Sequence, residues 1–384
     1  MTVTETSGIT SIRFNDEMEM IHAACASPRY QLAAARKRLL ARQLDRAEGD
    51  EVKNRLRVTA AVVVATGLAV GLLGCSAEAT PNTEPTAPVE LIPLNIGVTP
   101  TGLSTAQYAA LDEGIFEKAG FDVTLTVQAN LAEAMPRLLS NELQYIWADM
   151  HNAIVARAEG APLVVGAPTV VAPSKAPESG VGSLNFVVPE NSPIQGVGDF
   201  EGITIAVSAL GGQAHFDIMT VLERENVDVD LVKFVSIPPP QMAAALRQGQ
   251  VDAIAIVEPL GSLAIKEGGL RMVGQSDDAL PNAPMFVMAA TEEFILKDLD
   301  QARRFQEALF EAGSMVSGDR KLANRVMEGF LQLPPAVIAE TTLPIFATKP
   351  LTEKDLAPVI DRLVRFGALS KADSNLAAAM LPIK

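Results

Sequence analysis

Residues Leu94–Val127, LNIGVTPTGLSTAQYAALDEGIFEKAGFDVTLTV, decide the fold class. Their pattern predicts a buried strand over Leu94–Val98, a turn over Thr99–Ser104, an amphipathic helix over Thr105–Ala119 and a second strand over Asp122–Val127. A strand, a helix and a strand of this length predict a parallel sheet with right-handed crossovers.

Both ends of the expected helix carry a sequence signal. Ser104 is placed to be its N-cap, and Gly120 allows the chain to leave the helix. In parallel sheets, ligands bind beyond the carboxyl ends of the strands and beside helix N-termini. The turn lies at such an end, so Thr101, Ser104 and Thr105 are the first candidate binding residues.

The same stretch resembles the opening of a known family. The pattern G-x-x-P, followed by A-x-x-x-G-I-F-E-x-x-G-x-x-V, is similar to that of ABC-transporter substrate-binding proteins of the nitrate, sulfonate and taurine class, which includes binders of thiamine-pyrimidine precursors. The resemblance runs from Leu94 to Ala290, and more weakly to the C-terminus. It implies an α/β, two-lobed periplasmic-binding-protein fold of type 2 with two hinge crossings. It also implies delivery of a small polar solute to an ABC importer.

Composition limits the classes of function. The 384 residues carry a formal net charge of −15, which argues against nucleic acid because no basic face is available for phosphates. The two cysteines, Cys25 and Cys75, precede the expected globular part, so it contains no disulfide framework. The three histidines, His22, His151 and His215, are too scattered for a zinc cluster. We therefore expect no metal and no cofactor.

The segment before residue 94 predicts export and membrane attachment. Residues 53–75 have a basic start, an apolar stretch and the tetrad LLGC, which resembles the lipobox of a lipoprotein signal peptide with Cys75 as the lipidated residue. The alternative is an uncleaved anchor helix that ends in Cys75. Both interpretations place the remainder outside the cytoplasm. Residues 76–93 are rich in Ala, Thr, Pro and Glu and predict a flexible tether.

Residues 1–52 have two interpretations. The first is an N-terminal extension that is disordered or helical, or sequence upstream of a true start at Val52 through a GTG codon. The second is a cytoplasmic extension before a membrane span. The first interpretation is preferred because a complete signal-peptide pattern begins directly afterwards.

From residue 94 onward, strands and helices alternate in two units. The tetrad D-F-E-G at residues 199–202 resembles the family's turn before the first strand of the second lobe. Leu184–Val188 and Met285–Met288 are the expected chain crossings. Lobe 1 is then predicted to comprise residues 94–185 and 286–384, and lobe 2 residues 186–285. Two crossings permit hinge closure around a ligand. The segment after residue 291 predicts helices that cover lobe 1.

Four strand-to-helix junctions are expected to face the cleft: Thr99–Thr105, Trp147–Asn152, Ser208–Gln213 and Val257–Pro259. Helix N-termini offer unpaired N–H groups and a partial positive charge, which suits an oxyanion. The candidate ligand-binding residues are Thr101, Ser104, Thr105, Trp147, Asp149, Ser208, Gln213, His215 and Glu258.

Several of these residues keep two interpretations. Trp147 is either an apolar wall of the site or a packed interior residue. Val257-Glu258-Pro259 resembles the family's W-E-P junction, with Val in place of the aromatic residue; Glu258 either contacts an aminated ligand or caps its own helix. His215 either lines the cleft or is a half-buried residue bonded to the backbone. His151 is expected at the surface. Oxyanion and aminated solutes both stay open.

The sequence predicts a binding protein rather than an enzyme. It contains no G-x-S-x-G elbow, P-loop, G-x-G-x-x-G or H-E-x-x-H motif. The related eukaryotic pyrimidine synthase carries a Cys-rich motif that is absent here. We expect a monomeric, extracytoplasmic protein, anchored to the outer face of the cytoplasmic membrane through Cys75, whose partners are a small-molecule solute and ABC permease subunits. The alternatives are an enzyme of the pyrimidine-synthase type on the same fold and a membrane-anchored sensory domain.

Overall fold

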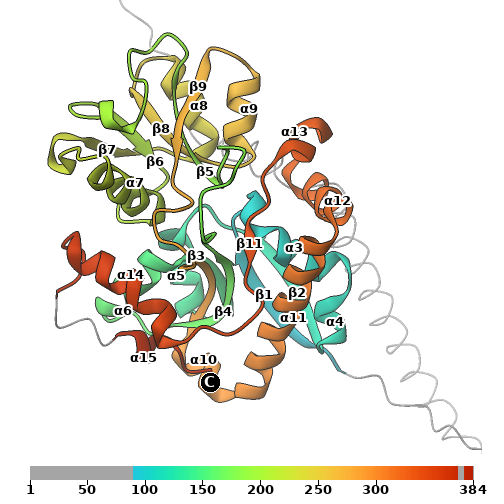
Figure 1. Cartoon of the computed structure of the whole chain (residues 1–384). Coiled ribbons are helices and arrows are strands. Elements are labelled where there is room, and N and C mark those ends of the chain that lie inside the picture. Colours follow the sequence, from blue (N-terminus) through green and yellow to red (C-terminus); the bar gives the residue numbers. More distant parts are fainter. Residues whose placement is uncertain (1–89, 371–375, 384) are drawn as a thin grey trace, which may run out of the picture. The chain divides into compact units, whose positions relative to one another are not determined.

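Two separate β-sheets organise the part of the chain that the structure describes, residues 90–370 and 376–383 of a computed structural model (Figure 1). All elements described here belong to one compact unit, Glu90–Lys384. The expectations for residues 1–52 and 53–75, for Cys75 and for most of the predicted tether lie outside the described residues.

Lobe 1 is built on a six-stranded sheet with the order β11-β4-β10-β3-β1-β2. β1 is parallel to β2 and β3, whereas β10 is antiparallel to β3 and β4, so the sheet is mixed rather than wholly parallel. Its strands are β1 (Ile92–Val98), β2 (Phe121–Val127), β3 (Tyr145–Asp149), β4 (Leu163–Val171), β10 (Pro284–Thr291) and β11 (Ile345–Phe346).

Helices before and after the second sheet accompany this lobe. The first group is α3 (Thr105–Asp112), α4 (Ile115–Lys118), α5 (Leu131–Leu139) and α6 (Met150–Ala158). The second is α10 (Glu292–Lys297), α11 (Leu299–Gly318), α12 (Arg320–Leu331), α13 (Pro335–Glu340), α14 (Glu353–Arg365) and α15 (Leu376–Met380). α11 packs on β4, and α14 and α15, drawn in red in Figure 1, pack on α6. The C-terminal helices therefore cover lobe 1, as predicted, whereas β11 and α15 were not predicted.

Lobe 2 is built on a five-stranded sheet with the order β7-β6-β8-β5-β9. β6 is parallel to β7 and β8, and β5 is antiparallel to β8 and β9. Its strands are β5 (Leu184–Pro189), β6 (Thr204–Val207), β7 (Lys233–Ser236), β8 (Ala253–Val257) and β9 (Leu270–Gln275), and its helices are α7 (Gln213–Arg224), α8 (Pro239–Arg247) and α9 (Leu260–Lys266). Two sheets with their own cores confirm the predicted α/β, two-lobed fold.

The chain passes between the sheets twice, within residues 172–183 and within residues 276–283. The strands that were expected to make the crossings, β5 and β10, each belong wholly to one sheet and directly follow a crossing. The two crossings are bonded to each other at both ends. The Ala172 N–H donates to the Ala283 carbonyl over 2.8 Å, and the Ser183 hydroxyl donates to the Asp277 carboxylate over 2.7 Å. The hinge is therefore a pair of segments that are hydrogen-bonded to each other, rather than two independent segments.

The first helix differs from its prediction at both ends. A single helix over Thr105–Ala119 was expected, but it is broken into α3 and α4 at Gly114, where φ is +67°. The Ser104 hydroxyl does not cap α3. It donates instead to the carbonyls of Thr99, at 2.8 Å, and Thr101, at 2.9 Å. Gly120, with φ of +91°, does end the segment as predicted.

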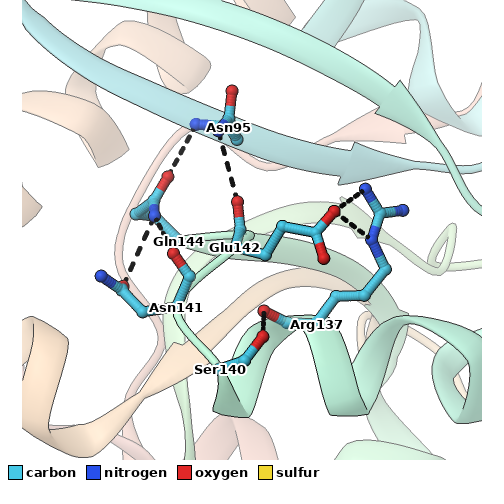
Figure 2. A network of polar contacts seen from close by, with 6 residues as sticks. All are labelled: Asn95, Arg137, Ser140, Asn141, Glu142 and Gln144. Atoms are coloured by element: carbon cyan, nitrogen blue, oxygen red, sulfur yellow. Dashed lines mark hydrogen bonds and ion pairs between the residues drawn. The ribbon is translucent and has the colours of Figure 1, made fainter.

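A polar network fixes the start of β1 against the loop before β3 (Figure 2). β1 pairs with β3 only from Ile96, and upstream of it the Asn95 N–H donates to the Gln144 side chain over 2.7 Å. The Asn95 amide also donates to the Glu142 carbonyl at 3.3 Å. The Gln144 side chain thus accepts the Asn95 N–H, and the Gln144 backbone N–H donates to the Asn95 carbonyl at 2.9 Å.

The core of lobe 1 is organised around the fully buried ring of Tyr145. This ring stacks on Phe305 at 3.8 Å and meets the edge of Phe294 at 5.4 Å. Gly166 on β4 leaves the space that the ring needs, because a Cβ there would lie 2.5 Å from Tyr145 Cε1. The ring is held on both sides, so it has little room to move away.

We expect Gly166→Ala to lower the free energy of unfolding by about 1–3 kcal/mol, the usual cost of overpacking a core. Urea denaturation of the purified globular part measures this. The matched control is Gly198→Ala, where an added Cβ meets nothing within 4 Å. Equal stability of the two variants would contradict this account of the Tyr145 packing.

Candidate functional site

The N-termini of α6 and α7, one from each lobe, meet at Asp149. Its carboxylate accepts the Asn152 N–H at 2.9 Å and the Asn152 side-chain amide at 2.6 Å, so Asp149 is the N-cap of α6. The backbone N–H of Gln213, the first residue of α7, lies close enough to this carboxylate to lower its pKa. Next to it, a Cβ on Gly212 would lie only 3.2 Å from the Asn152 amide nitrogen. The predicted residues Asp149 and Gln213 are thus brought together.

Burial controls the ionisation of Asp149. It raises the pKa of the carboxyl to about 6, and the hydrogen bonds from Asn152 and the nearby Gln213 N–H work in the opposite direction. The group therefore titrates close to neutral pH although it caps a helix.

The junctions after β1 and β8 form a second contact between the lobes. A Cβ on Gly102 would lie 3.2 Å from the Glu258 carbonyl oxygen and 3.7 Å from Pro259 Cδ. A Cβ at this distance is tighter than most real contacts, so a side chain at Gly102 would require the Glu258 backbone to shift slightly. The predicted junctions Thr99–Thr105 and Val257–Pro259 therefore face each other directly.

The Glu258 carboxylate is bound within lobe 2. Its side chain is 3% exposed, and its oxygens accept the Ser262 N–H at 3.0 Å, the Ser262 hydroxyl at 2.6 Å and the Asn185 amide at 3.0 Å. Burial raises the pKa of this carboxyl, and these hydrogen bonds oppose the rise. The bonds to Ser262 are those of a cap for α9. The contact of Glu258 with a solute stays a prediction.

The three candidates after β1 differ in availability. The Ser104 and Thr105 hydroxyls are buried and donate within their own turn, Thr105 to the Gly102 carbonyl at 2.7 Å. Thr101 is half-buried, and its Oγ1 has no hydrogen-bond partner among the residues that the structure describes. A contact of Thr101 with a solute stays a prediction.

Trp147 is an interior residue at the end of β3. It is 8% exposed and stacks on Phe286 with ring centroids 4.2 Å apart. Its backbone carbonyl accepts the Gln128 amide at 2.7 Å. Its indole Nε1 has no hydrogen-bond partner within the described part of the chain. The ring therefore has the packed arrangement, and a contact of the indole N–H with a solute stays a prediction.

Ser208 and His215 lie on lobe 2. Ser208 is exposed. His215 is half-buried, its Nδ1 accepts the Gly211 N–H at 3.0 Å, and its ring meets Phe234 edge-on at 4.4 Å. Burial lowers the pKa of His215. His215 therefore has the contacts expected for a half-buried residue bonded to the backbone. A contact of Ser208 or His215 with a solute stays a prediction.

An ion pair that sequence reasoning missed crosses between the lobes. Arg362 of α14 donates through Nη1 to the Asp217 carboxylate of α7, and Gln213 Nε2 donates to the same carboxylate at 3.2 Å. His151, expected at the surface, is instead 2% exposed, with Nε2 3.5 Å from Arg362 Nη1. The surface expectation for His151 is wrong because α14 packs over α6.

Sequence signals for this cluster exist. Arg362 interrupts the apolar stripe of α14 that contains Leu356, Val359 and Leu363, all buried. A charged residue at such a position needs a buried partner. Gln213 and Asp217 are four residues apart, so they lie on one face of α7. These signals show that the residues are buried but not that they meet.

The cluster lines a small cavity with room for about one water molecule. Besides the residues named, the second crossing contributes Ser276 and Asp277 to its wall. In residues 90–370 and 376–383, no group of three His, Cys, Asp or Glu side chains is arranged to hold a metal ion. None of the helices in those two ranges combines the length and apolar character that crossing a membrane requires.

The raised pKa of Asp149 predicts a pH-dependent stability. The folded protein binds this proton more tightly than the unfolded chain, so the stabilisation is complete below pH 3.8 and is lost as the pH rises through about 6. A shift of this size corresponds to about 3 kcal/mol. The side chain in Asp149→Asn is neutral at every pH. The free energy of unfolding of this variant minus that of wild type should therefore increase by roughly that amount between pH 4 and pH 7.

Urea denaturation of both proteins at a series of pH values measures this difference. The control is Asp319→Asn at the exposed N-cap of α12, which should change by less than about 1 kcal/mol over the same range. A constant difference between Asp149→Asn and wild type would contradict the assignment.

Comparison with solved structures agrees with this architecture. The alkanesulfonate-binding protein SsuA from Xanthomonas axonopodis pv. citri, bound to MOPS, has a TM-score of 0.63 and 20% identity, with 76% of this chain and 98% of that chain covered. The periplasmic aliphatic sulphonate-binding protein SsuA from Escherichia coli has a TM-score of 0.62 and 21% identity, covering 75% and 91%. The periplasmic nitrate-binding protein NrtA from Synechocystis PCC 6803 has a TM-score of 0.63 and 14% identity, covering 76% and 86%.

These similarities show the fold. No curated protein matches the chain. Residues 87–328 match the NMT1-like family, and this span covers both sheets apart from β11. The chain therefore belongs to the NMT1-like family.

Proposed function

We propose that this protein is the solute-binding component of an ABC importer and takes a small polar solute between its two lobes. The observation that carries the proposal is the meeting of helix N-termini from both lobes at Asp149 and Gln213, beside a strap of two crossings. Supporting it, the similar structures named above bind alkanesulfonates or nitrate according to their descriptions.

The mechanism requires no chemical step. A solute that bonds to groups of both lobes favours the closed arrangement in proportion to its differential affinity for that state. The Asp149–Gln213 contact and the Gly102–Glu258 contact support the proposal that these strand ends come together on closure. The candidate residues with a polar atom that has no partner within residues 90–370 and 376–383 are Thr101 and Trp147 of lobe 1 and Gln213 of lobe 2.

The location of the protein is part of the proposal. Cys75 carries the lipid, residues 53–75 are the signal peptide, and residues 76–93 tether the monomeric binding protein to the outer face of the cytoplasmic membrane. We divide the lobes at the two crossings, so that β5 with Asn185 belongs to lobe 2 and β10 with Pro284 belongs to lobe 1. The support for the anchor is the order of basic, apolar, LLGC and tether segments in the sequence.

The solute carries either an oxyanion or an amine. Helix N-termini favour the oxyanion, whereas the carboxylates of Asp149 and Glu258 favour a group that donates hydrogen bonds. The proposed contacts are Thr101, Ser104, Thr105, Trp147, Asp149, Ser208, Gln213, His215 and Glu258.

A panel of taurine, alkanesulfonates, nitrate and aminopyrimidines tests the function. A true solute at about 100 times its Kd should stabilise the protein by roughly 2.7 kcal/mol, visible as a raised Tm. Calorimetry should give one site per chain, and mass spectrometry should recover the solute unchanged. Release of a product would contradict the transport assignment and support the enzyme alternative.

Glu258→Gln separates the two interpretations of that residue. Gln keeps an oxygen for the Ser262 cap but loses the negative charge, so an aminated solute should bind roughly tenfold to a hundredfold more weakly. Titration calorimetry with the solute found in the panel measures this change. An unchanged affinity would leave Glu258 with its capping role alone.

A further inference from the structure

One side of α7, a helix of lobe 2, packs against α6 and α14 of lobe 1 (Figure 1). Phe216 of α7 is 3% exposed and belongs to the core cluster of lobe 1, together with Ile154 of α6 and Val359 of α14. Its ring stacks on His151 with centroids 5.4 Å apart and on Phe366, directly after α14, with centroids 6.0 Å apart. A side chain of lobe 2 therefore completes the apolar core of lobe 1.

The next residue of α7 forms a buried ion pair with lobe 1. Asp217 accepts from Nη1 of Arg362 on α14, and the two side chains are 6% and 1% exposed. The loss of hydration of two buried charges largely offsets their attraction, but loss of either partner leaves the other charge buried and unpaired, which is costly. The pair therefore adds little net stability and instead requires α7 and α14 to keep this one arrangement.

The rim of the same contact is exposed. Arg365 of α14 lies 3.4 Å from the Glu223 carboxylate of α7, and these side chains are 51% and 41% exposed. Water and salt screen an exposed pair, so its contribution is small. Burial of the Phe216 ring thus provides most of the stabilisation between α7 and α14, and the buried pair fixes their relative position.

These interactions involve protein groups only. Phe216 packs on residues of lobe 1, and Asp217 is paired with Arg362, so none of the three needs a solute to complete its contacts. Separation of the lobes would expose the Phe216 ring to water and pull the ion pair apart. Because burial of apolar surface is favourable, this contact favours the closed arrangement by itself.

We propose that α7 and α14 form a latch, consisting of Phe216, Asp217 and Arg362, that closes the two lobes without help from the solute. The consequence for binding rests on the proposed function. A solute that bonds to both lobes needs the closed arrangement, so its apparent affinity is proportional to the fraction of protein that is closed. The latch residues therefore set solute affinity without touching the solute.

The test measures the separation of the lobes in protein without added solute. Glu159→Cys and Glu201→Cys place one spin label on an exposed position of each lobe, in the full chain with Cys25→Ser and Cys75→Ser, which removes both native cysteines. Double electron–electron resonance gives the distribution of distances between the labels. Circular dichroism checks that each variant is folded.

The variants are Asp217→Asn, Arg362→Met, the combination of these two, Phe216→Ala, and the control Arg303→Met at an exposed position of α11. Each single charge variant leaves an unpaired buried charge in the closed arrangement only, so the ratio of closed to open protein should fall at least about tenfold. The double variant leaves no unpaired charge and should recover most of this loss.

The apolar part of the latch has its own variant. Phe216→Ala removes most of the apolar surface that α7 buries in lobe 1, so its distances should also shift toward the open arrangement. It leaves the ion pair in place and decides the test if a charge variant does not fold. Arg303→Met should have the wild-type distances.

Wild-type distances in the folded charge variants and in folded Phe216→Ala overturn the proposal, because α7 and α14 would then stay together in both arrangements. For a solute found in the panel, Arg362→Met should bind more weakly by the factor by which its closed fraction falls, and Arg303→Met should bind like wild type. Equal binding by wild type and by an Arg362→Met protein with a reduced closed fraction contradicts the link to affinity.

The outcomes separate the latch from the proposed function, because the distances are measured without solute. Shifted distances together with turnover of a panel compound support the latch and overturn the transport function. Unshifted distances in a protein that binds a panel solute overturn the latch and leave the transport function intact.

Discussion

Exclusion of water from charged groups between the lobes is the constraint on which this structure depends. Asp149, Asp217 and Glu258 are carboxylates whose pKa is raised, first of all by burial. A buried carboxylate without partners costs several kcal/mol, so each must be bonded. Asp149 and Asp217 draw partners from the opposite lobe, the Gln213 N–H and Arg362. Glu258 is bonded only within lobe 2, to Asn185 and Ser262 in its own surroundings.

This difference assigns different tasks to the carboxylates. The contacts of Asp149 with Gln213 and of Asp217 with Arg362 exist only while the lobes are together, so they contribute to the equilibrium between open and closed arrangements. The Glu258 bonds involve no group of lobe 1 and are independent of closure. The two crossings are bonded to each other through Ala172 with Ala283 and through Ser183 with Asp277. The two crossings thus form one hinge, and the contacts of Asp149 and Asp217 between the lobes determine how far this hinge closes.

Local patterns in the sequence were enough to predict the helices and strands, but they did not predict the contacts between the lobes. The strands predicted over Leu94–Val98 and Asp122–Val127 are present as β1 and β2 and end at the predicted residues, because each is a short apolar run between clear turn signals. The break at Gly114 and the two-residue β11 depend on packing with distant segments, which no local pattern contains. His151 and Arg362 were misplaced or missed for the same reason. Their burial arises only when α14, more than 200 residues after α6, packs on it.

The oxyanion and aminated interpretations of the solute do not exclude each other. The helix N-termini favour a group with acceptor atoms, whereas the carboxylates of Asp149 and Glu258 favour a group that donates hydrogen bonds. Gln213 connects the two requirements, because its N–H reaches Asp149 while its side chain bonds to Asp217 and leaves one oxygen unpaired. A solute with an anionic end and a hydrogen-bond-donating end satisfies both sets. A solute with only one of these ends leaves buried polar groups without partners, and that cost is the physical basis of discrimination against it.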